Sequence, residues 1–189
     1  MTGRERVSVS ETWGTTPDER QRSFPCDASL PHVDAQLYRG ITIKASPEVV
    51  FRWLCQLRVA PYSYDWIDNG GRQSPKELVP GLERLEIGQD VMTIFTLTSF
   101  TPNEHLTIRL KPSRSAKSVF GDIAVSYLIV PISNHSCRLL VKLAVHHSHT
   151  VTGRLMRSFL PWGDLIMMRR QLMNLKLLAE KHSSVYGAG

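Results

Sequence analysis

The chain has 189 residues, of which 42% are hydrophobic and 21% charged, and this is the composition of a soluble globular protein with one main domain. These values exclude a fibrous or wholly disordered chain, and no apolar run approaches the roughly 20 residues that span a bilayer. The formal net charge of +6 lies mainly in the second half of the chain, where residues 151–189 hold 6 basic and 2 acidic groups.

The cysteines and the N-terminus indicate a cytoplasmic protein. Cys26, Cys55 and Cys137 lie far apart and form no CxxC motif, so we expect reduced, mostly buried thiols. Residues 1–27 contain arginines, acids and serines but no apolar segment of the kind found in a signal peptide. We therefore predict neither secretion nor membrane insertion.

The composition changes near residue 36. Residues 1–35 mix Thr, Ser, Pro, Gly and charged residues without apolar periodicity, which predicts a flexible N-terminal extension. We expect the folded domain to span residues 36–183, followed by a short tail at 184–189.

A strand and a helix should open this domain. Leu37, Ile41 and Ile43 alternate with polar residues, as in a strand with one buried face. Ser46 can then cap a helix that has Pro47 at its first position. The apolar stripe of this helix is formed by Val49, Val50, Trp53, Leu54 and Leu57.

Pro and Gly residues interrupt residues 58–88, and four strands should follow this segment. The strands are predicted at Asp90–Phe100, Glu104–Lys111, Ser118–Pro131 and Cys137–His149. Short turns between them imply an antiparallel meander. In the last strand, apolar residues alternate with polar ones, so one face should be covered and the other should face water.

The cover should be a C-terminal helix. Its apolar residues recur at spacings of three and four, at Leu165, Met168, Leu172, Leu175 and Ala179. Arg154–Leu160 also has a helical pattern. The intervening Pro161-Trp162-Gly163 should break or kink the helix, and Asp164 could cap its restart.

This order of elements, with two sequence motifs, resembles a known superfamily. Ala45–Leu54 (ASPEVVFRWL) resembles the opening of the START-like (SRPBCC) superfamily. Tyr62–Asn69 (YSYDWIDN), together with Gly88–Asp90 and Met168–Leu172, resembles its bacterial branch labelled polyketide cyclase/dehydrase. The resemblance covers about residues 37–182. It implies an α+β helix-grip fold, in which a curved antiparallel sheet wraps around a long C-terminal helix, with a largely apolar cavity between them.

The superfamily includes carriers, cyclases and other proteins, so the resemblance implies binding but no particular reaction. The residues that we predict to contact a hydrophobic ligand in this cavity are Trp53, Tyr62, Tyr64, Trp66, Phe95, Val141, Leu143, His147, His149, Phe159, Trp162, Met168 and Leu172. The aromatic residues among them could equally serve as core packing.

Polar residues near this cavity have more than one interpretation. His147 and His149 could be acid/base groups, hydrogen-bond anchors or two ligands of a metal, although no third ligand stands nearby in the sequence. The simplest interpretation is a strand end that leaves the core for water. Arg39 could bind an anionic group if it faces inward, which the strand parity does not settle, whereas the parity of Arg109 indicates that it faces outward.

Three functions are compatible with these features. The first is a carrier or sensor that binds a lipid-like, polyketide-like or other apolar metabolite and orients it by Tyr64, His147 and Arg39. The second is a cyclase or dehydratase in which His147, Tyr64 or Asp65 moves a proton. The third is an interaction module whose basic C-terminal helix docks an acidic partner or a nucleic acid, although a solvated helix face is the favoured interpretation of these charges.

Two further classes of function lack support in the sequence. The basic residues are dispersed rather than gathered beside groove-reading residues, so we predict no nucleic-acid partner. No phosphate-binding, nucleophile-elbow or HExxH motif is present in the sequence, and we predict no cofactor and no metal.

Overall fold

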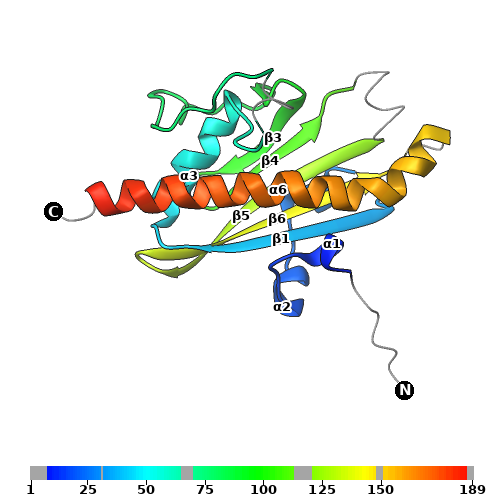
Figure 1. The fold of residues 1–189 in the computed structure, drawn as a ribbon, viewed down its shortest axis with the longest axis horizontal. Coiled ribbons are helices and arrows are strands. Elements are labelled where there is room, and N and C mark those ends of the chain that lie inside the picture. The colour runs from blue at the N-terminus through cyan, green and yellow to red at the C-terminus, as the bar shows by residue number, and fades with distance from the viewer. Residues whose placement is uncertain (1–7, 31, 65–69, 113–120, 148–150, 187–189) are drawn as a thin grey trace.

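The computed structural model describes residues 8–30, 32–64, 70–112, 121–147 and 151–186, with only the backbone at 151–158 and 185–186. A long helix, α6 (Val151–Tyr186), lies across one face of an antiparallel sheet, as Figure 1 shows. The six strands of the sheet follow the order β1-β6-β5-β4-β3-β2. This is the α+β helix-grip arrangement that the sequence predicted.

The strands pair with their neighbours in the predicted meander. They are β1 (Ala35–Ile43), β2 (Asp90–Val91), β3 (Phe95–Thr101), β4 (His105–Leu110), β5 (Asp122–Ser133) and β6 (Ser136–His146). Residues 90–100 were expected to form one strand but form two. The backbone turns at Met92 and Thr93, both of which have positive φ angles (47° and 64°), and this turn separates β2 from β3.

Helix α3 (Pro47–Cys55) forms as predicted, and a short 3-10 turn, η2 (Gln56–Arg58), extends it. The Ser46 hydroxyl accepts a hydrogen bond from the Val49 amide at 3.4 Å. Trp53 and Leu54 are buried against the sheet. The part of the chain that follows, as far as it is described, contains no helix before β2.

The N-terminal segment packs against the sheet, which corrects the expectation of a flexible extension for residues 8–30. It forms α1 (Val9–Thr12), α2 (Pro17–Arg20) and a 3-10 turn, η1 (Pro25–Ala28). Phe24 and Cys26 are buried on the outer face of the sheet beside Leu140 of β6. The face of β6 that should have met water is therefore covered, because Leu140 and Ala144 offer apolar surface there.

Two polar contacts secure this segment. Arg138 of β6 donates two hydrogen bonds to the Glu19 carboxylate, at 2.7 and 2.9 Å. The Cys26 amide donates to the Ser126 hydroxyl at 2.8 Å. Gly40 of β1 packs so closely against Gly14 that an added Cβ would lie 2.8 Å from the Gly14 carbonyl oxygen.

Helix α6 continues through Pro161 instead of breaking there. Its first turns run in a different direction from the rest (Figure 1), as expected where proline removes one backbone hydrogen bond. Asp164 is not a cap, because it lies inside the continuous helix and turns toward β1. Contacts of α6 with the sheet outweigh the local cost of the proline.

The three cysteines are buried and unpaired by disulfides, as predicted. Burial raises the pKa of the Cys55 thiol to about 12 and that of Cys137 to about 11. Within the described residues, no helix combines the length and the apolar character needed to cross a membrane.

The packing of the N-terminal segment predicts a loss of stability when its buried anchor is removed. Phe24 is 2% exposed, so Phe24→Ala should lower the free energy of unfolding by about 3 kcal/mol. Phe159→Ala is the matched control: that ring is 63% exposed and its loss should cost no more than about 0.5 kcal/mol. Urea unfolding measures both, and equal midpoints for the two variants would contradict the packing.

Candidate ligand-binding site

The space between the sheet and α6 contains polar side chains as well as apolar ones. Arg39, Val141 and Tyr127 are neighbours in one row across β1, β6 and β5. All three lie on the inner face, because Arg39 shares its parity on β1 with the core residues Leu37 and Ile43. This settles the orientation of Arg39 that the sequence left open.

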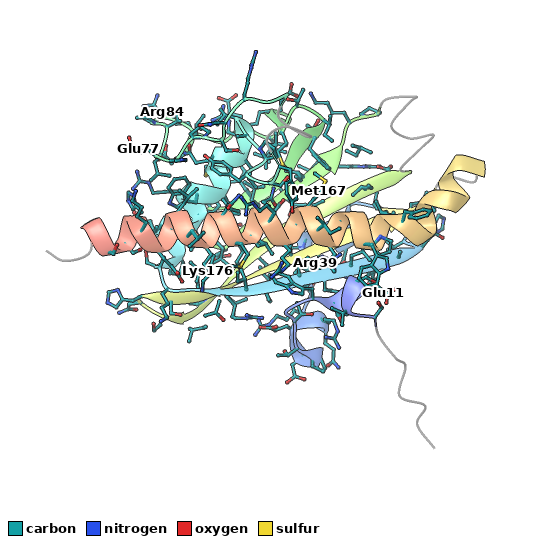
Figure 2. All side chains as sticks on the ribbon, viewed as in Figure 1. Glu11, Arg39, Glu77, Arg84, Met167 and Lys176 are labelled. Atoms are coloured by element: carbon teal, nitrogen blue, oxygen red, sulfur yellow. The ribbon has the colours of Figure 1, made fainter. Side chains whose placement is uncertain are left out.

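Arg39 is fully buried and pairs with Asp164 of α6. Figure 2 labels Arg39 between this helix and β1. Its Nη2 donates to the Asp164 carboxylate at 2.6 Å and to the Pro161 carbonyl at 3.3 Å, and its Nη1 donates to the Tyr38 carbonyl at 2.9 Å. Burial raises the pKa of Asp164 to about 6, although the charge of Arg39 acts in the opposite direction. The pair is therefore held in a strongly desolvated place.

A second polar cluster connects the sheet to the loop after α3. The Tyr127 hydroxyl donates to the Gln171 side-chain oxygen at 2.8 Å, and the Gln171 amide donates to the Pro61 carbonyl at 2.6 Å. Asn174 donates to the Tyr62 carbonyl at 2.8 Å. Burial raises the pKa of Tyr127 well above its usual range, and the charge of Asp164 raises it further. These bonds fix the start of the predicted aromatic segment under α6.

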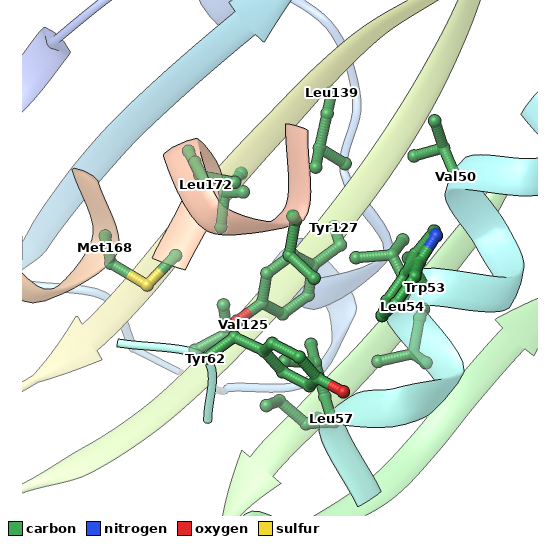
Figure 3. Packing of buried hydrophobic residues seen from close by; sticks show 14 of the residues in the cluster. Val50, Trp53, Leu54, Leu57, Tyr62, Val125, Tyr127, Leu139, Met168 and Leu172 are labelled. Atoms are coloured by element: carbon green, nitrogen blue, oxygen red, sulfur yellow. The ribbon is translucent and has the colours of Figure 1, made fainter. Parts of the chain in front are cut away.

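Beyond this cluster, side chains fill the interior. Figure 3 shows Leu172 and Met168 of α6 pointing toward Tyr127, Tyr62 and the residues of α3. The rings of Trp53 and Tyr62 meet edge to face, with centroids 6.1 Å apart. Six of the predicted ligand contacts are thus core residues: Trp53, Tyr62, Val141, Leu143, Met168 and Leu172.

A pocket of about 310 Å³ opens where α6 passes over the beginning of β1 and the end of β6. Its lining residues are Glu11, Asp34, Ala35, Gln36, Leu37, His147, Leu160 and Pro161. Pro161 also accepts the hydrogen bond from Arg39, so the buried ion pair lies directly behind this pocket. The volume is at the small end of the range for small-molecule sites.

Asp34 organises the polar side of the pocket. Its Oδ2 accepts a hydrogen bond from the His147 amide at 2.8 Å and lies 2.9 Å from His146 Nδ1. The hydrogen bond from the His147 backbone amide is the main reason why the pKa of Asp34 is lowered. Asp34 is therefore a carboxylate at neutral pH and, with Glu11 nearby, makes this side of the pocket rich in acceptors.

A larger but more open hollow of about 490 Å³ lies at the other end of α6. Its lining residues are Lys44, Ala45, Ser46, Val49, His135, Glu180, His182, Ser183 and Ser184. It contains none of the predicted ligand contacts. Among the residues that the structure describes, no three His, Cys, Asp or Glu side chains gather as metal ligands.

The remaining predicted residues do not form one site. Phe159 and Trp162 are 63% and 56% exposed on the outer face of α6, so they do not line the space under the helix. Tyr64 lies under Arg170, nine residues along α6 from Pro161, and it does not line the pocket of His147. Phe95 is half-buried on β3. Asp65, Trp66 and His149 lie outside the described residues.

Three comparisons with known proteins bear on the fold. Zhui aromatase/cyclase from Streptomyces sp. R1128 matches with a TM-score of 0.50 at 13% identity, over 82% of this chain and 97% of that one. A protein from Nitrosospira multiformis matches with a TM-score of 0.50 at 13% identity, over 79% and 99%. A START superfamily protein from Mycobacterium smegmatis has a TM-score of 0.49 at 16% identity, over 78% and 98%.

The chain therefore shares its fold with Zhui aromatase/cyclase and with the Nitrosospira protein. The likeness confirms the architecture that the motifs predicted, and at these identities it concerns the fold alone. No family model and no curated protein matches the sequence itself. Asp34, Gln36, Asp164 and Gln171 were not predicted as site residues. The sequence contains no signal for the buried carboxylate opposite Arg39, because strand parity left the orientation of Arg39 open.

The Arg39–Asp164 pair predicts strongly non-additive effects on stability. Arg39→Met leaves the Asp164 carboxylate, 9% exposed, without its partner and should lower the free energy of unfolding by about 3–5 kcal/mol. The double variant Arg39→Met/Asp164→Leu should recover most of this loss. Breaking the exposed Arg52–Glu83 pair by Arg52→Met should cost less than about 1 kcal/mol. Additive losses in a double-mutant cycle at Arg39 and Asp164 would contradict the pairing.

Asp164 also predicts a pH dependence. Its pKa is raised from 3.8 to about 6, so between these values the folded chain holds a proton that the unfolded chain has released. Stability should therefore fall by about 2–3 kcal/mol as the pH rises from about 4 to about 7. Urea unfolding of Asp164→Asn should lack this decrease, whereas the exposed Asp18→Asn should retain it. The same slope in Asp164→Asn and the wild type would exclude Asp164 as its source.

Proposed function

We propose that this protein binds a small, mainly apolar molecule with one hydrogen-bond-donating end, as a carrier or sensor. The pocket beside the buried Arg39–Asp164 pair carries the proposal. Leu37, Leu160 and Pro161 would provide apolar contact beside the polar groups of the lining. Asp34 and Glu11 would accept hydrogen bonds from a hydroxyl or amine.

The START-like fold supports this class of function, because proteins with this architecture hold ligands between sheet and helix. The position of the pocket fits the same plan, since it lies where α6 crosses the ends of β1 and β6. Of the predicted ligand contacts that the structure describes, His147 is the one that lines it. We propose that the polar groups there orient the ligand while the apolar wall holds it.

Turnover is a separate question from binding. One similar structure is an aromatase/cyclase. In this chain His147 lines the pocket, whereas Tyr64 packs under Arg170 and does not line it. We therefore propose binding at this pocket, and a cyclase that uses His147 as its proton-transfer group is the second candidate.

Native mass spectrometry of the freshly purified protein tests the proposal. We expect a defined extra mass that disappears on denaturation, or, for a bare protein, binding of added 2-naphthol in preference to naphthalene. The preference is expected because only 2-naphthol carries a donor for Asp34 or Glu11. A bare protein that binds neither compound would contradict the proposed pocket, and equal binding would contradict its donor specificity.

A matched pair of leucines on α6 identifies the pocket. Leu160 and Leu178 are both half-buried and packed against the core, but only Leu160 lines the pocket. Leu160→Arg should weaken binding at least about tenfold, because a charge would occupy the apolar wall, whereas Leu178→Arg should not. Equal effects of the two substitutions would place the ligand elsewhere. The core residue Leu172 is unsuitable for this test, because Leu172→Arg would destabilise the fold.

A further inference from the structure

Helix α6 has a second apolar face, opposite the one that packs against the sheet. At 100° per residue, its members fall within a sector of about 60°. We call them the outer stripe, and their exposed fractions are 63% for Phe159, 56% for Trp162, 56% for Ile166, 37% for Met173 and 61% for Leu177. The helix faces the sheet with a separate, buried set: Leu165, Met168, Leu172, Leu175 and Ala179.

Basic residues border the outer stripe on both sides. Arg169 leans over the ring of Trp13 at 5.8 Å, toward the N-terminal segment. Arg170 leans over the ring of Tyr64 at 5.9 Å, toward the loop after α3. On the helical wheel Lys176 falls on the side of Arg169, and Lys181 falls on the side of Arg170. The result is an apolar centre between two basic margins.

The acidic residues of α6 neutralise one of the four basic residues in these margins, Lys176. Asp164 turns inward to Arg39, and Glu180 pairs with Lys176 at 3.0 Å. The two arginines contact aromatic rings, a contact that preserves their positive charge. The surface thus combines exposed aromatic and aliphatic side chains with net positive charge.

We propose that the outer stripe docks the protein on an anionic lipid surface, with α6 lying in the plane of the interface. Tryptophan favours the boundary between headgroups and acyl chains, so Trp162 is suited to this place. Arginine can bury its stem while its guanidinium reaches lipid phosphates. The helix would lie on the membrane without crossing it, and this docking is independent of the proposed pocket.

A second copy of the chain fits the outer stripe less well. The midpoint of Phe159–Leu177 is residue 168, so the axis of a two-fold pairing along the stripe would pass close to Arg169 and Arg170. Arg169 and Arg170 of one copy would then lie close to Arg169 and Arg170 of the other, and their positive charges would repel. A lipid surface offers the opposite charge at the margins and an apolar layer at the centre.

Flotation with lipid vesicles tests the docking. The protein should float with phosphatidylcholine vesicles that contain about one third phosphatidylglycerol, much less with phosphatidylcholine alone, and less as salt rises from about 0.1 M to about 1 M. No flotation with the anionic vesicles at low salt would overturn the proposal. Equal flotation with both kinds of vesicle would overturn the role of the basic margins.

Two matched sets of substitutions locate the surface. Phe159→Ser/Trp162→Ser/Ile166→Ser should reduce vesicle binding at least about tenfold. Ile87→Ser/Ile94→Ser/Ile132→Ser removes similarly exposed residues (62%, 55% and 58%) away from α6 and should leave binding unchanged. Likewise, Arg169→Gln/Arg170→Gln should weaken binding, whereas Arg22→Gln/Lys76→Gln should weaken it less.

Circular dichroism shows whether each variant keeps its fold, which the exposure of these residues predicts. Equal effects of the two triple substitutions would exclude the outer stripe as the docking surface. Analytical ultracentrifugation without vesicles measures whether the protein forms a dimer. If the wild type forms a dimer that the stripe variant abolishes, the occupant is a second copy and the lipid proposal is wrong.

Discussion

The inner apolar residues of α6 must be covered by the sheet. The other elements are positioned by the packing of this helix on the sheet. Leu172, Leu175 and Ala179 are essentially fully buried, and the interior around them is filled by Trp53, Tyr62 and Tyr127. This half of the helix is therefore a packed core. Open space is found at the two ends of α6, in the hollow beside Glu180 and in the pocket near Leu160 and Pro161, where the helix passes the ends of β1 and β6.

Polar groups inside this interface hold the helix in register. Arg39 connects β1 to Asp164, and Tyr127 connects β5 to Gln171. Buried ionic groups are costly unless they are paired, so the fold tolerates Arg39 and Asp164 only in this arrangement. Arg39 also donates a hydrogen bond to the carbonyl of Pro161, which lines the pocket, so the ion pair adjoins the proposed ligand site.

The two faces of α6 suggest a division of roles. The inner face closes the fold and borders the proposed ligand pocket, whereas the outer stripe is available for an external surface. Leu160 lines the pocket, and the adjacent Phe159 is 63% exposed. A ligand in the pocket and a lipid surface on the stripe would thus meet the same turn of the helix, which would suit a protein that exchanges an apolar molecule with a membrane.

The sequence by itself determined the main strands and helices, since strand alternation, the Ser46 cap and the spacing of Leu165 to Ala179 are local patterns, and the resemblance of its motifs implied their helix-grip arrangement. It did not determine where the N-terminal segment packs, because Phe24 and Cys26 are buried largely against β5 and β6, about 100 residues or more away. Strand parity could not orient Arg39 without its distant partner Asp164. Of the candidate site, it identified His147, while Asp34, Leu160 and Pro161 converge only through tertiary packing.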